Sequence, residues 1–186
     1  MFHFVLRGCV ATMFALLIAV SAPALAFGQQ ASASAERPLI TRGRADLNLA
    51  GAELLLAKAK EMAEQMKLQV NIAVVDDGGQ LLAFARMDGA RPGSANTALT
   101  KAISAATMRR PTGPVSPPGS AVDVHLNLSL QSAAAASGGK VTTLFGGVNI
   151  VIDGQTIGAV GVGGATGEQD AEIASAAIAA LQDAVK

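Results

Sequence analysis

Two arginines and an aspartate stand close together in the middle of the chain, at Arg86, Asp88 and Arg91. They follow an apolar run, so we expect them at the end of a strand. Guanidinium groups form paired hydrogen bonds with a carboxylate, which makes this cluster a candidate site for a carboxylated ligand. The alternative is a solvated junction between a strand and a helix, in which Asp88 forms an ion pair with Arg86 or Lys101.

Lys101 and His125 are the other side chains whose types suggest chemistry. Lys101 lies among alanines, and a lysine that has lost its water shell acts as a nucleophile or binds an anion. The alternative is an exposed lysine whose aliphatic stem covers apolar surface. His125 is a candidate axial ligand to a metal ion or a haem, and a plain surface histidine is the alternative.

Composition argues against several classes of function. The 186 residues carry 14 basic and 14 acidic side chains, so no positive surplus favours nucleic acid as the main partner. The only cysteine is Cys9 and the only other histidine is His3. Both lie near the N-terminus, which leaves the rest of the chain without thiolate chemistry or a multi-histidine metal site.

Residues 1–26 have the features of a cleaved secretory signal peptide. Arg7 precedes an uncharged apolar run, and Ala24-Leu25-Ala26 supplies the small residues that signal peptidase requires. An uncleaved N-terminal anchor is the alternative. We expect a mature chain that begins at Phe27 and is periplasmic or secreted, with a flexible leader over residues 27–45 and a folded domain over residues 46–186.

Hydrophobic periodicity predicts a mixture of helices and hairpins in the domain. Asp-Gly pairs at 77–78 and 153–154, each between two apolar runs, indicate two β-hairpins. Residues 120–131 alternate like a strand but carry a helix-capping pattern and run into four alanines, so strand and helix both remain open. The expected elements are helices from 46 or 48 to about 67, over 94–110 and over about 168–185, and strands over 70–75, 80–86, 148–152 and 155–162.

These elements predict an α+β fold with a central antiparallel β-sheet built from two hairpins and flanked by helices. The first and last helices are expected on one face of the sheet. The glycine-rich run at 158–167 lacks the lysine of a phosphate-binding loop and is interpreted as structural, with an anion at the following helix N-terminus as the alternative.

The ordered motifs together resemble the GlcG/HbpS family, which includes the C-terminal domain of PduO-type proteins. The resemblance covers about residues 46–185. Its motifs are Val74-Val75-Asp76-x-Gly78-Gly79, Arg86-Met87-Asp88-Gly89-Ala90, Ser94, Lys101-Ala102, Pro111-Thr112, Gly146-Gly147-Val148-x-Ile150, Asp153-Gly154, Gly158-Ala159-x-Gly161-Val162 and Gln169-Asp170.

The resemblance implies profilin- or roadblock-like layering of helices on the sheet, a helix over 120–136, and assembly into homo-oligomers. It also implies binding of haem, with a corrinoid as the alternative, and a membrane sensor protein as a partner. The candidate cofactor-binding residues are His125, which is also the candidate metal ligand, Arg86, Arg91, Lys101 and Thr112.

Two functions from different classes follow. The favoured one is an exported haem- or tetrapyrrole-binding protein that takes part in haem or iron sensing, with the cationic side chains on the propionates. The alternative is a small accessory enzyme or subunit in which Lys101 and Asp88 act on a small hydroxy acid such as glycolate. The sequence favours a binding protein over an enzyme.

Overall fold

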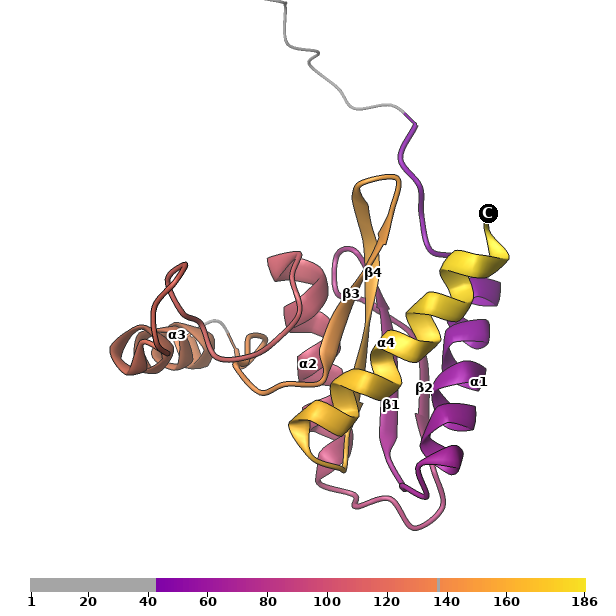
Figure 1. The fold of residues 1–186 in the computed structure, drawn as a ribbon, viewed down its shortest axis with the longest axis horizontal. Coiled ribbons are helices and arrows are strands. Elements are labelled where there is room, and N and C mark those ends of the chain that lie inside the picture. The colour runs from indigo at the N-terminus through magenta and orange to yellow at the C-terminus, as the bar shows by residue number, and fades with distance from the viewer. Residues whose placement is uncertain (1–42, 137) are drawn as a thin grey trace, which may run out of the picture. The chain divides into compact units, whose positions relative to one another are not determined.

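The computed structural model describes residues 43–136 and 138–186, which contain eight regular elements (Figure 1). The predicted signal peptide and residues 27–42 of the predicted leader lie outside the described residues. Asn48 caps helix α1 (Leu49–Gln65): its side-chain oxygen accepts a hydrogen bond from the Gly51 amide at 2.8 Å. Thr166 caps helix α4 (Gly167–Ala184) and forms a reciprocal capping box with Gln169. In each helix, the residue before the first turn therefore accepts a hydrogen bond from a backbone amide that has no partner within the helix.

Two antiparallel hairpins form one four-stranded sheet, as predicted. Strands β1 (Asn71–Asp76), β2 (Leu81–Arg86), β3 (Gly147–Ile152) and β4 (Gln155–Gly163) lie in the order β2-β1-β4-β3. In the β3–β4 turn, Asp153 and Gly154 have φ angles of 48° and 73°, which match the tight turn that an Asp-Gly pair favours. The β1–β2 turn places Gly79, not Gly78, in the left-handed region, with φ 80°.

Helices cover both faces of the sheet. Helices α1 and α4 pack on one face over a core of leucine, isoleucine and valine, as predicted for the first and last helices (Figure 1). Helix α2 (Ser94–Met108) covers the other face, where alanines such as Ala98 and Ala102 meet Ala73 and Ala159. The result is an α+β domain with the sheet between two helical layers.

The glycine-rich run at residues 158–167 is structural, because α2 lies very close to β4. A Cβ atom on Gly161 would lie 2.2 Å from the Ala98 carbonyl oxygen, and one on Gly163 would lie 2.9 Å from that of Ser94. The amide of Gln169 in the following helix is bonded to the Thr166 hydroxyl. Glycine is required here so that a helix of small residues can approach the strand.

Residues 124–136 form helix α3 (Val124–Ala136), so the helical alternative is the correct one. Asp123 caps it by accepting a hydrogen bond from the Leu126 amide at 2.9 Å, and the helix starts four residues after Ser120. Helix α3 lies to one side of the sheet and the other helices (Figure 1). Among the described residues, no helix combines the length and apolarity needed to span a membrane.

Candidate functional site

Lys101 on α2 and Asp170 on α4 form a buried ion pair at one end of the sheet. The Lys101 ammonium lies 2.7 Å from Asp170 Oδ2 and also donates to the Val162 carbonyl oxygen at 2.9 Å. The other carboxylate oxygen of Asp170 accepts a hydrogen bond from the Ala165 amide at 3.1 Å. The two residues are 3% and 1% exposed, so both charges depend on these partners for stabilisation.

A pair of glycines makes room for the ion pair. A Cβ atom on Gly146 would lie 2.6 Å from Asp170 Cβ and 2.8 Å from Lys101 Nζ. One on Gly147 would lie 2.3 Å from the Lys101 carbonyl oxygen. Gly146 and Gly147 have no side chains to fill this space. The Lys101 side chain can therefore extend from α2 to Asp170 on α4.

A cavity of about 460 Å³ opens over this ion pair. Its size lies within the range of small-molecule binding sites in proteins. Lys101 uses two of its three N–H donors for Asp170 and Val162, so a third remains on a side chain that lines the cavity. The complete lining is Arg91, Ser94, Thr97, Lys101, Pro114, Thr143, Leu144, Phe145, Gly164, Ala165, Gly167, Glu168 and Asp170.

Arg91 is held at the rim of this cavity by one hydrogen bond of its side chain and one of its backbone. Its Nε donates to the Ser94 hydroxyl at 2.9 Å, and its carbonyl oxygen accepts from the Asn71 side-chain amide at 3.1 Å. These bonds leave the terminal guanidinium nitrogens for a ligand. Glu168 is an exposed carboxylate on the same lining, so it opposes an anionic ligand there.

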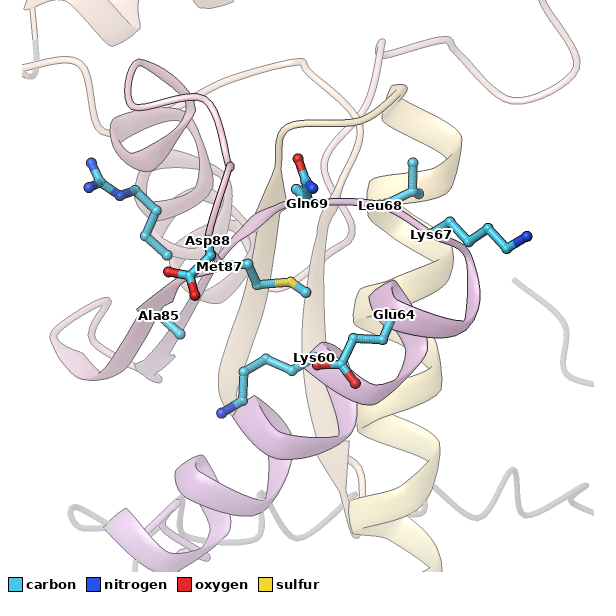
Figure 2. Close-up of a pocket in the computed structure, with 9 residues that line it drawn as sticks. Lys60, Glu64, Lys67, Leu68, Gln69, Ala85, Met87 and Asp88 are labelled. Carbon is cyan, nitrogen blue, oxygen red and sulfur yellow. The ribbon is translucent and has the colours of Figure 1, made fainter.

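The predicted cluster of Arg86, Asp88 and Arg91 is divided between two cavities. Arg86 and Asp88 line a separate cavity of about 640 Å³ between α1 and the end of β2. Figure 2 shows Met87 in the middle of that cavity, Lys60 and Glu64 approaching from α1, and Lys67 pointing away. Arg91 faces the other cavity because the chain turns at Gly89, which has a φ of 81°.

Lys101 pairs with Asp170, so the alternative in which Asp88 forms an ion pair with Lys101 is wrong. Asp88 and Lys101 line different cavities, and the arrangement expected for an enzyme that uses both does not form. Sequence reasoning named Asp170 only in a motif and as a helix-terminal acid. Its position in the first turn of the last helix was the available signal.

Thr112 has a structural position beside the cavity. It is buried, its hydroxyl accepts from the Gly147 amide at 2.8 Å, and its own amide donates to the Gly147 carbonyl oxygen at 2.9 Å. Thr112 therefore holds the start of β3 in place, and it is absent from the lining of the cavity that contains Lys101.

His125 lies on α3, where its side chain is exposed, and it does not line either cavity described above. It is the only histidine among the described residues. Within the same residues, no group of three or more histidine, cysteine, aspartate or glutamate side chains could hold a metal ion. The predicted arginine and lysine of the cavity are thus brought together without the predicted axial ligand.

The fold and site define an α+β domain with a buried cation beneath an open, partly apolar cavity. Residues 47–179 match the family described as "Haem degrading protein HbpS-like", and the chain belongs to this family. The resemblance inferred from the sequence motifs is therefore confirmed.

Relatives and solved structures agree with this assignment. Protein GlcG of Escherichia coli (strain K12) is 42% identical over 111 residues, which are 60% of this chain and 76% of the relative. The crystal structure of HbpS is similar with a TM-score of 0.62 at 29% identity, covering 78% of this chain and 96% of the other. The crystal structure of a PduOC–haem complex gives a TM-score of 0.61 at 29% identity, covering 73% of this chain and 95% of the other.

Proposed function

We propose that this protein binds haem in the cavity over Lys101 and Asp170. The observation that carries the proposal is the joint presence of two cationic side chains and an apolar wall. The Arg91 guanidinium and the third N–H of Lys101 offer donors for the propionate carboxylates. Leu144 and Phe145, which are 55% and 44% exposed, offer apolar contact to the macrocycle. The family and the haem complex of PduOC support this choice of ligand.

The cavity suits the propionate groups and the apolar ring of haem better than it suits the iron. Its cations and apolar side chains suit a propionate-bearing edge, whereas its lining contains no histidine, cysteine, methionine or tyrosine. Haem held here would supply the redox chemistry of its iron. Residues of this chain would hold the ring by its carboxylates and its apolar faces.

Titration with haemin tests the proposal. The purified protein should give a saturable Soret band at micromolar haemin, and Arg91→Glu should weaken the apparent affinity about tenfold or more. Lys60→Glu is the matched control, because it makes the same charge change on the other cavity. Absence of a saturable band in the wild type, or equal weakening by both variants, would contradict the proposal.

Cobalamin and glycolate belong in the same experiment as competing ligands. A corrinoid is the alternative tetrapyrrole-like ligand, and a small hydroxy acid is the ligand of the alternative function. Arg91 and Lys101 would bind the carboxylate of glycolate as they would a propionate, but a two-carbon acid makes no use of Leu144 and Phe145. A thermal shift that is larger with glycolate than with haemin would favour the alternative.

We also propose that the mature protein is exported and acts as an oligomer, with a membrane sensor as a partner. The signal-peptide pattern of residues 1–26 supports export, and the exposed apolar side chains of α3 support self-association.

Intact-mass analysis of the exported protein should give a chain that begins at Phe27. Light scattering should give a mass above that of one chain, and haem-dependent co-purification with a membrane protein would test the sensor.

A further inference from the structure

Two arginines from distant parts of the chain line a further cavity, at the end of the sheet where β3 turns into β4. Arg44 precedes α1, and Arg109 directly follows α2. The β3–β4 turn and the residues that precede α1 lie at the same end of the domain (Figure 1). The volume is about 550 Å³, which is within the range of small-molecule sites. The lining, hereafter the arginine cavity, is Arg44, Arg109, Asn149, Val151, Gly154, Gln155 and Thr156.

The arginine cavity differs from the other two cavities in the sign of its charge. Among the described residues that line it, both charged side chains are cationic and none is a carboxylate. By contrast, Asp88 lines the cavity between α1 and β2, and Glu168 and Asp170 line the cavity over Lys101. An anion in the arginine cavity therefore meets no carboxylate on the lining.

Both guanidinium groups keep hydrogen-bond donors for a ligand. Arg44 donates to Asp77, which lies outside the lining and holds the arginine in place. A guanidinium has five N–H donors in a planar fork, so most donors of Arg44 remain. Within the part of the chain that the structure describes, the Arg109 side chain forms no hydrogen bond or ion pair. Arg109 is therefore the cation of this cavity whose charge no neighbouring carboxylate balances.

The strands add neutral donors to the two arginines. The Asn149 side-chain amide donates to the Thr156 hydroxyl at 3.5 Å, which leaves the hydroxyl proton for another acceptor. Gln155 supplies a second side-chain amide on the same lining. A phosphoryl group carries up to two negative charges and three strong acceptor oxygens, so it matches two guanidinium groups and a hydroxyl. A single carboxylate has one charge and two oxygens, and it would use fewer of these donors.

We propose that the arginine cavity binds a small phosphate monoester. Arg44 and Arg109 bind the phosphoryl oxygens, and Thr156 donates its hydroxyl proton. The cavity is larger than a phosphate ion, and Val151, which is 39% exposed, offers apolar contact to the organic part of the ester.

The arginine cavity is separate from the cavity proposed to bind haem. Thr156 lies near the start of β4, and Val162, whose carbonyl oxygen accepts from Lys101, lies near its end. The distance along the strand between these residues is on the order of 20 Å, at roughly 3.4 Å per residue. Binding of a phosphate ester is therefore independent of haem binding.

Isothermal titration calorimetry with glycerol phosphate tests the proposal. We expect saturable binding of one ligand per chain, with higher affinity than for inorganic phosphate or succinate. Arg109→Gln should weaken the apparent affinity about tenfold or more, since a hydrogen bond between charged groups is lost. Arg110→Gln is the matched control, because it removes the same charge from the next residue, which lines a different cavity. Equal affinities for the three ligands, or equal weakening by the two variants, would overturn the proposal.

A glycine variant separates ligand binding from the stability of the fold. Arg109 has a φ of 53°, a left-handed conformation that glycine adopts more easily than arginine. Arg109→Gly should therefore melt at an unchanged or higher temperature, while its affinity for glycerol phosphate should fall as in Arg109→Gln. Wild-type affinity in this variant would contradict the proposal. Arg91→Glu, in the other cavity, should bind glycerol phosphate as the wild type does, and a loss there would also overturn it.

Discussion

Lys101 and Asp170 belong to helices that cover opposite faces of one sheet, yet their side chains meet with Nζ and Oδ2 2.7 Å apart. The ion pair joins the two helical layers at the end of β4, beside the glycines that lead into β3. It also fixes the floor of the cavity proposed to bind haem. One contact thus links the stability of the fold to the position of a cationic donor.

Removal of one member of the pair should be much more costly than removal of both. Lys101→Met leaves the Asp170 carboxylate buried without its cation, and we expect a loss of about 3 kcal/mol in the free energy of unfolding. The double variant Lys101→Met with Asp170→Leu should recover most of this loss, because it leaves no buried charge. Urea denaturation measures both. A single variant as stable as the wild type would contradict the structural role.

Gly161→Ala should destabilise the protein by about 2 kcal/mol or more, because the new methyl group would collide with the backbone of α2 at the Ala98 carbonyl oxygen. Gly93→Ala is the matched control. Gly93 has a φ of −62° and open space around its Cβ position, so alanine there should be neutral or slightly stabilising. Thermal melting measures both variants. An equal change in melting temperature for the two would refute the close packing of α2 on the sheet.

Gly154→Val should destabilise by about 1 kcal/mol or more for a different reason. The position has a φ of 73° and nothing within 4 Å of the added Cβ, so the cost comes from the backbone alone. Asp153 precedes it with a φ of 48°, which makes this turn doubly left-handed. An unchanged melting temperature would mean that the hairpin turn is assigned wrongly.

Glu168→Gln should raise the affinity for haemin about two- to five-fold, because it removes an exposed carboxylate from the lining of the cavity proposed to bind the propionates. Glu172→Gln is the matched control on the same helix. It removes the same charge at a position outside the cavity lining and should leave the affinity unchanged. The difference should shrink at high salt, since exposed charges are screened. Equal effects of the two variants would count against the proposed propionate position.

Sequence patterns predicted most of the fold because its signals are local. The Asp153-Gly154 turn and the apolar stripe of α1 each depend on residues close together in the chain. The strand-like alternation at 120–131 was less decisive, since only one side of α3 packs against the protein and exposed leucines hide the helical period.

The site was less accessible to sequence reasoning. Asp170 lies 69 residues from Lys101, and their contact depends on how closely two glycines let the helical layers approach. Arg86 and Arg91 are near neighbours in sequence, yet a turn with Gly89 in the left-handed region sends them to different cavities. Side-chain partners of this kind follow from packing between layers, which no local pattern encodes.

Native mass spectrometry of the protein with haemin tests the central claim most directly, because it counts bound ligands on each assembly. We expect one haem per chain in the wild type, on an assembly of more than one chain, and loss of the haem adduct in the double variant Arg91→Glu with Thr97→Trp. A wild type without bound haem, or a double variant that keeps one haem per chain, would contradict haem binding in the cavity over Lys101 and Asp170.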